Sequence, residues 1–224
     1  MTLARAEDSW PVTREVDRLV IQLFARVSDA IAGATLALLR GDRAAAKVLV
    51  DGDAEIDALY REIERLVEGN LSANADFPQR LRYLIDVLRL LPELERSGDL
   101  AEHIARRGAV GLTAEMSARA RGLIERMGEV ASAMWRTSAD AYGDGALDVG
   151  QRLEERDDEM DELHVTLMAE LASGVMDIPV VIELTLVGRF YERLGDHAVN
   201  LAKRVPARAY QASDLVPPVA LRAH

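Results

Sequence analysis

ERSGDLAEHIAR (Glu95–Arg106) and ERLGDHAVNLAK (Glu192–Lys203) are two copies of one pattern, identical at six of twelve aligned positions. Upstream of them, DAEIDAL (53–59) matches DDEMDEL (157–163) at four of seven positions. The matching stretches follow one another in the same order in both halves of the chain. This order indicates an internal duplication.

In each copy, the two matching stretches flank a predicted turn, DFP at 76–78 and DIP at 177–179. Proline is tolerated in the first turn of a helix, so each turn predicts a helix start. Asp57 lies 19 residues before Asp76, and Glu95 lies 19 residues after it; the second copy has separations of 16 and 15 residues. Because an α-helix rises about 1.5 Å per residue, two stretches that are equally far from the turn lie at the same level of the helical hairpin. We call the two separations the arms of the hairpin.

Apolar residues recur at helical spacing along most of the chain, interrupted by short polar breaks that contain Gly or Asp. Asp42 is the predicted N-cap of the second helix, and Thr113 that of the fourth. In the second helix the predicted apolar positions include Val48, Ile56 and Ile63. The six predicted helices span 12–40, 43–71, from after Asp76 to about 107, 113 to about 142, 146–173, and 177 to about 206.

The predicted fold class is therefore all-α, with two tandem three-helix-bundle repeats that together make a six-helix protein. The first predicted repeat is 12–109 and the second is 113–206. The remaining residues, 207–224, contain a Pro-Pro pair and are expected to form a loose C-terminal tail.

Composition excludes several classes of function. The chain has 38 acidic residues against 27 Lys or Arg, a net charge of −11, and only 4% aromatic residues, which argues against nucleic-acid binding. It has no Cys, so disulfides and thiolate sites are excluded and a reducing cytosol is expected. The N-terminus lacks the apolar core of a signal peptide, and no run of about 18 uninterrupted apolar residues occurs, so direct membrane insertion is not expected. No nucleophilic triad or glycine-rich phosphate loop appears, and we expect no enzyme.

The duplicated stretches carry acidic pairs four residues apart, a spacing that puts both carboxylates on one helix face. Like charges at this spacing destabilise a helix, and two such pairs brought together across a hairpin call for cations. Oxygen ligands without Cys suit divalent or trivalent metals: iron, Mg, Mn or Zn. We therefore predict one metal site in each repeat, from eight residues: Asp53, Asp57, Glu95 and Asp99 in the first, and Asp157, Asp161, Glu192 and Asp196 in the second.

Other interpretations of the same motifs stay open. An acidic pair can be a solvated helix face, and Arg96 and Arg193, next to the glutamates, can neutralise the acids in a salt-bridge network. Gly98 and Gly195 lie within helices, where glycine permits either close helix crossing or room for a metal. His103 and His164 can join the sites; His197 is expected to point elsewhere.

The repeated ERxGD elements at 95–99 and 192–196, each preceded by a DxxxD helix, resemble the PhoU family. The run LTLVGRFYERLGDHAVNLAKRV (184–205) is especially similar. The resemblance covers about residues 12–206. It implies a six-helix, two-repeat bundle that is often dimeric and binds a multinuclear metal through the eight acidic residues named above.

The resemblance also implies a function. PhoU proteins act in the cytoplasm, or peripherally at the inner face of the membrane through partners, and repress the phosphate regulon when phosphate is plentiful. The partners implied are the ATPase subunit of the phosphate-specific ABC transporter, a sensor histidine kinase and a second copy of the chain. Two alternatives stay open: an accessory protein of another phosphate carrier, and a di-metal helical bundle of unrelated role. Di-iron bundles use Glu-x-x-His, and no His here has Glu three residues before it.

Overall fold

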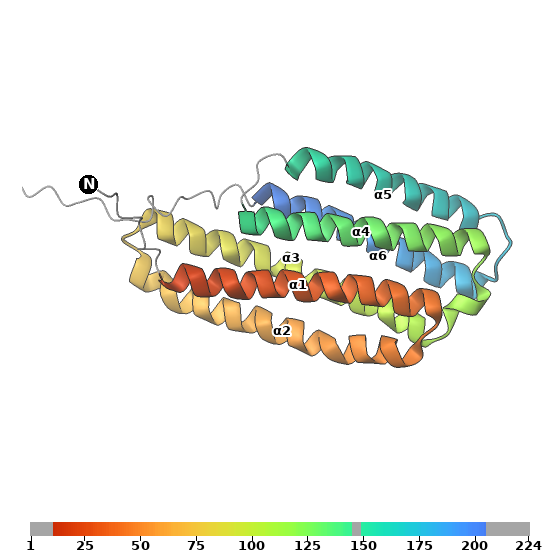
Figure 1. Cartoon of the computed structure of the whole chain (residues 1–224), viewed down its shortest axis with the longest axis horizontal. Helices are drawn as coiled ribbons and strands as arrows, with labels where there is room; N and C mark the ends of the chain where they lie inside the picture. The colour runs from red at the N-terminus through yellow and green to blue at the C-terminus, as the bar shows by residue number, and fades with distance from the viewer. Residues whose placement is uncertain (1–10, 145–148, 205–224) are drawn as a thin grey trace, which may run out of the picture.

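The computed structural model describes residues 11–144 and 149–204. Within these ranges the chain forms six long α-helices and no strand, which confirms the predicted all-α class (Figure 1). Two short 3₁₀ turns, η1 (Ser72–Asn74) and η2 (Leu112–Glu115), lie in the connections. The helices are α1 (Pro11–Arg40), α2 (Arg43–Leu71), α3 (Pro78–Ala109), α4 (Ala118–Asp144), α5 (Val149–Leu171) and α6 (Ile178–Arg204).

The helices pack as two groups of three along one long axis (Figure 1). Helices α1, α2 and α3 contact one another, and so do α4, α5 and α6. The two groups meet through α1 against α4 and α3 against α6, while α2 and α5 lie at opposite edges (Figure 1). The exact repeat boundaries, 12–109 and 113–206, stay a prediction, and the predicted tail at 207–224 lies outside the described residues.

Apolar side chains on the inward faces of all six helices form one continuous core. Among the described residues, α1 alone is long and apolar enough to cross a membrane by length and composition. Most of its apolar residues are buried inside the bundle, although Ile21 and Leu36 are exposed, and the core helix of a bundle passes the same test of length and composition. Among the apolar positions expected in the second helix, Ile56 and Ile63 of α2 are buried, whereas Val48 is 70% exposed.

The predicted helix starts were partly right. Asp42 caps α2, because its carboxylate accepts hydrogen bonds from the backbone N–H groups of Ala44 and Ala45 at 3.1 and 3.0 Å. Thr113 does not cap α4: it lies in η2, and its hydroxyl donates to the carbonyl of Leu38. Ser117 does the capping, because its Oγ accepts from the N–H of Ala120 at 3.0 Å.

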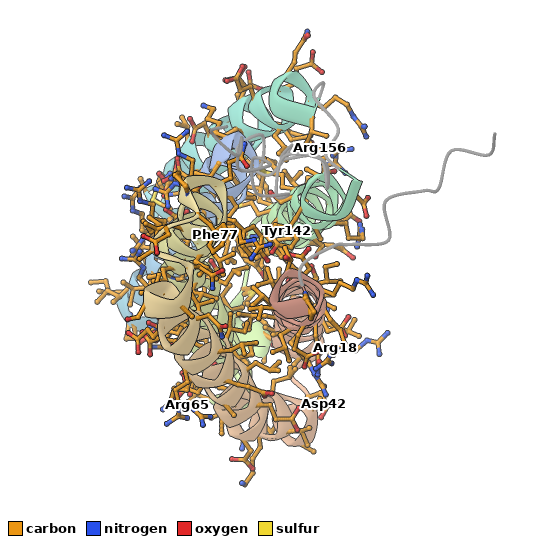
Figure 2. The ribbon with its side chains drawn as sticks, turned by 90° about the vertical axis from the view of Figure 1, so that its left-hand side faces the viewer. Arg18, Asp42, Arg65, Phe77, Tyr142 and Arg156 are labelled. Atoms are coloured by element: carbon orange, nitrogen blue, oxygen red, sulfur yellow. The ribbon has the colours of Figure 1, made fainter. Side chains whose placement is uncertain are left out.

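Aromatic side chains join the two groups of helices. Phe24 of α1 contacts Trp135 and Tyr142 of α4, with ring centroids 6.0 and 5.5 Å apart. Figure 2, a view along the bundle, shows Tyr142 between the two halves. Tyr191 of α6 donates a buried hydrogen bond of 2.7 Å to the hydroxyl of Thr35 on α1, which itself donates to a backbone carbonyl. These contacts fix the relative position of the halves and therefore of the acidic stretches that they carry.

Candidate functional site

The first acidic set consists of Asp53 and Asp57 on α2 with Glu95 and Asp99 on α3. The structure places these four residues across the α2–α3 hairpin, near enough for their charges to act on one another. Gly98 of α3 lies directly beside Asp53 of α2: a Cβ added at Gly98 would lie 3.4 Å from Oδ1 of Asp53. Glycine thus lets the two helices approach beside the carboxylates.

The electrostatics of this set are those of crowded, partly buried acids. Burial raises the pKa of Asp53 to about 6, with further increases from the charges of Asp99, Glu102 and Asp57. Burial also raises the pKa of Glu95 and of Asp99, and Asp57 adds to both effects. The set therefore carries more negative charge than its surroundings neutralise.

Glu102 is a member of this cluster that the sequence prediction missed. It follows Asp99 by three residues on the same face of α3, and its charge raises the pKa of Asp53 and of Asp99. The spacing of Glu102 from Asp99 is a signal that could have identified it. The second repeat has Val199 at the equivalent position, so a search for residues shared by the two copies missed Glu102. A pocket of about 260 Å³ opens beside Asp53 and Glu102, between α1, α2 and α3.

The second acidic set consists of Asp157 and Asp161 on α5 with Glu192 and Asp196 on α6. Burial raises the pKa of Asp157 to about 6, and the charges of Asp196, Asp161 and Asp158 raise it further. This is the same pattern, at the equivalent residue, as in the first set. The duplication has therefore reproduced an environment as well as a sequence.

The second set has a carboxylate oxygen without a hydrogen-bond partner and open space beside another carboxylate oxygen. Oε2 of Glu192 is buried and has no hydrogen-bond partner, while the other carboxylate oxygen pairs with Arg189. A Cβ added at Gly195 would lie 3.1 Å from Oδ1 of Asp157, so glycine keeps the space beside that oxygen open. A buried oxygen without a partner is costly unless something else satisfies it.

These observations fit a hard cation in donor chemistry and in charge. In the conformation observed, however, no three acidic or His side chains within the described residues converge closely enough to hold a metal ion. A cation would have to draw the carboxylates closer together.

The expected cations contribute only in part. Arg96 and Arg193 form no ion pair with either set among the described residues, but the charge of Arg96 lowers the pKa of Glu95 against the increase caused by burial. The neutralising arginines lie on the same helices as the acids: Arg61 with Asp57 at 3.5 Å, Arg106 with Glu102, and Arg189 with Glu192.

Two histidines lie near the acidic sets and one lies apart from them. The charge of His103 lowers the pKa of Asp99, and the charge of His164 lowers the pKa of Glu192. Burial has the larger effect, so the pKa of each acid is raised overall. His197 points to the α3–α6 seam, where its Nδ1 lies 2.8 Å from Oγ of Ser97. Burial lowers the pKa of His197 to about 4, and nearby guanidinium charges contribute.

Comparison with known proteins gives one consistent result. The PhoU domain family model matches residues 20–108 and 124–205. A protein of Caulobacter vibrioides, named phosphate-specific transport system accessory protein PhoU homolog, is 34% identical over 197 residues, 86% of this chain and 84% of the relative. Homolog 2 of the same name in Mycobacterium tuberculosis is 28% identical over 191 residues, 82% of this chain and 86% of the relative.

Two solved structures share the fold. The crystal structure of PhoU from Pseudomonas aeruginosa superposes with a TM-score of 0.80 at 25% identity, over 87% of this chain and 95% of that one. The phosphate transport system regulatory protein PhoU from Streptococcus pneumoniae superposes with a TM-score of 0.73 at 20% identity, over 92% of this chain and 97% of that one.

Proposed function

Because this chain belongs to the PhoU family, we propose that it is a non-enzymatic accessory protein of a phosphate-specific transport system that represses the phosphate regulon. In this role it couples the ATPase subunit of the transporter to a sensor histidine kinase, in the cytoplasm or at the inner face of the membrane through these partners. The names of its relatives and the extent of the matched sequence support the transport role.

The observation that carries the proposal is the duplicated acidic environment. Two aspartates at equivalent positions, Asp53 and Asp157, have the same raised pKa of about 6 for the same reasons, burial and crowding by matched carboxylates. Retaining this costly arrangement twice favours a shared role in both halves.

We propose that the role is metal binding by the eight acidic residues of the two sets. A bound cation would supply the positive charge that each set lacks, and it would link α2 to α3 and α5 to α6. Glu192 offers a buried oxygen without a partner, and Asp157 has open space beside it. Iron, Mg, Mn and Zn all suit such oxygen donors.

A protein partner is supported by exposed apolar residues that share one face of α6. Ile178, Ile182 and Leu186 follow one another at intervals of four residues and are 74%, 54% and 39% exposed. On the opposite half, Leu36 and Val48 are exposed beside a pocket between α1 and α2. Apolar surface of this kind favours contact with another protein or a second copy of the chain.

The test is a strain that lacks the gene and carries a reporter of the phosphate regulon. Deletion is expected to activate the reporter in phosphate-rich medium, and the intact gene to restore repression. Pull-down from the same cells is expected to recover the transporter ATPase or the kinase. A reporter that stays repressed after deletion, with neither partner recovered, would refute the proposal.

A further inference from the structure

A groove runs along the seam between α1 and α2, in the first half of the molecule. Two hollows form it, one of about 260 Å³ and one of about 310 Å³, and Val48 and Leu49 line both of them. Along α1 the lining extends from Arg26 to Arg40, 14 residues apart, which is about 21 Å of helix at about 1.5 Å per residue. The two hollows are therefore successive parts of one α1–α2 groove, long enough for about four turns of another helix.

Small residues keep this groove open. Five residues of α1 and α2 in its lining are Ala or Gly: Ala30, Gly33, Ala37, Ala45 and Gly52. A Cβ added at Gly33 would lie 2.9 Å from Cδ2 of Leu49, so glycine lets Leu49 lie against α1. Leu36 and Val48 also line the groove, and they are 46% and 70% exposed. Large apolar side chains left exposed beside an open groove favour burial by another molecule.

The second half of the chain lacks residues that make the groove. When DAEIDAL is aligned with DDEMDEL, Val48 and Gly52 correspond to Arg152 and Arg156. Two long cationic side chains thus replace an exposed valine and a small lining residue. Figure 2 shows Arg156 and Asp42 in opposite halves of the bundle. The groove belongs to one half alone, so the duplicated function of the acidic sets does not account for it.

The two ends of the groove differ in charge. Four acids and one arginine line the hollow at the Arg26 end. Of these acids, one pairs with Arg26 at 3.2 Å, one pairs with an arginine outside the lining, and one belongs to the first acidic set. The fourth, Asp29, is exposed and forms no ion pair among the described residues. At the other end the charges of Arg40 and Asp42 balance. The end beside Asp29 therefore selects for positive charge.

We propose that the α1–α2 groove binds an amphipathic helix of a partner protein, with its apolar side chains against Leu36 and Val48 and a Lys or Arg beside Asp29. A helix with apolar residues at i, i+3 or i+4, and i+7 fills a groove of this form. A second copy of the chain is disfavoured as the occupant, because it carries the same net charge of −11. That a protein partner exists rests on the proposed function; the place and the chemistry of the contact rest on the groove.

The probes are two synthetic peptides of about 15 residues, each covalently stapled so that it stays helical. Both carry Leu at i, i+4, i+7 and i+11. One has Lys at one end, and the other has Glu at the same positions. Fluorescence anisotropy measures the binding of each peptide to the purified full chain, with chelator present so that metal does not change the charge of the acidic sets.

The variant that tests the apolar contact is Leu36→Asp with Val48→Asp. Its matched control is Ile21→Asp with Val165→Asp, because Ile21 and Val165 are 47% and 68% exposed and lie outside the groove lining. Asp29→Lys tests the charged contact, and Asp140→Lys, at an exposed position of α4, is its control. Helical circular dichroism checks that each variant is folded.

We expect the wild type and the Ile21/Val165 control to bind the Lys peptide with similar affinity, and the Leu36/Val48 variant to bind it about tenfold more weakly or not at all. The wild type should bind the Glu peptide about tenfold more weakly than the Lys peptide. Asp29→Lys should abolish that preference, and Asp140→Lys should retain it.

Three results would overturn the inference. They are no binding of the Lys peptide by the folded wild type, equal loss in the Leu36/Val48 variant and its control, and equal affinity of the wild type for the two peptides. Sedimentation velocity tests the other occupant: a wild-type dimer that the Leu36/Val48 variant alone dissociates would assign the groove to a second copy of the chain and overturn the proposal. The regulatory role would survive each of these results, because the reporter strain tests it separately.

Discussion

Replacing Asp53 and Asp157 together by Asn is expected to stabilise the metal-free protein at neutral pH. Both aspartates are half-buried among other carboxylates, and the pKa of each is raised to about 6 from an ordinary value of 3.8. Asn keeps the shape of the side chain and removes the charge. The variant therefore relieves repulsion and desolvation without opening a cavity.

The magnitude follows from the shifts. An increase of about two pKa units corresponds to about 3 kcal/mol per group when each unit is worth about 1.4 kcal/mol. Because both carboxyls are partly solvated, screening reduces this to about 1 kcal/mol each. The double variant should then gain about 2 kcal/mol in free energy of unfolding, or about 4–8 °C in Tm for a chain of this length.

The pH dependence has a definite sign. The folded-state pKa values lie above the unfolded ones, so between about pH 4 and 6 the folded protein binds more protons than the unfolded chain. The stability of the wild type should fall as pH rises through this window. The gain of the variant over the wild type should be absent near pH 4 and complete above about pH 6.

Thermal unfolding followed by circular dichroism between pH 4 and 8, with chelator present, measures both effects. Asp76→Asn with Asp140→Asn is the control, since both aspartates are exposed and lie outside the two sets. A variant that is less stable than the wild type at pH 7.5, or a difference that does not change with pH, would refute the reasoning.

Three further predictions concern packing and partners. Gly108→Ala should lower the free energy of unfolding by about 1–3 kcal/mol, because the added Cβ would lie 3.0 Å from the backbone of α1. Gly122→Ala should raise the free energy of unfolding by about 0.5–1 kcal/mol, because no atom lies within 4 Å of the added Cβ. Chemical denaturation measures both changes. Tyr191→Phe should cost about 1 kcal/mol in the same assay, because it removes a buried hydrogen bond between the halves. Ile182→Asp should reduce recovery of a protein partner in pull-downs and Val165→Asp should not; equal recovery with both would exclude the α6 face as the contact.

The helices could be predicted from the sequence because local signals define them. Periodic apolar residues and polar breaks gave most helix ends within a few residues, and Asp42 caps α2 as expected. The start of α4 was wrong because Thr113 hydrogen-bonds to α1 instead of to its own helix, a contact across 75 residues. The predicted start of the fifth helix at 146 falls outside the described residues.

Site residues that occur in both repeats could be predicted from the sequence, whereas a residue that occurs in one repeat was missed. Comparison of the two copies pointed to Asp53 and Asp157, which share one environment. The same comparison concealed Glu102, because the second copy has an apolar residue there. The contact between Ser97 and His197 depends on how the halves pack, which no local pattern encodes.

Metal content of the purified protein is the measurement that tests the central claim most directly. After dialysis against iron, Mn, Mg or Zn and removal of free ion, elemental analysis of the wild type should detect bound metal. Asp99→Ala and Asp196→Ala should each lose the share held by one set, and their combination should lose all of it, while Glu129→Ala should retain the wild-type amount. A folded wild type without bound metal, or one whose metal survives both substitutions, would contradict the assignment of the acidic sets as metal sites.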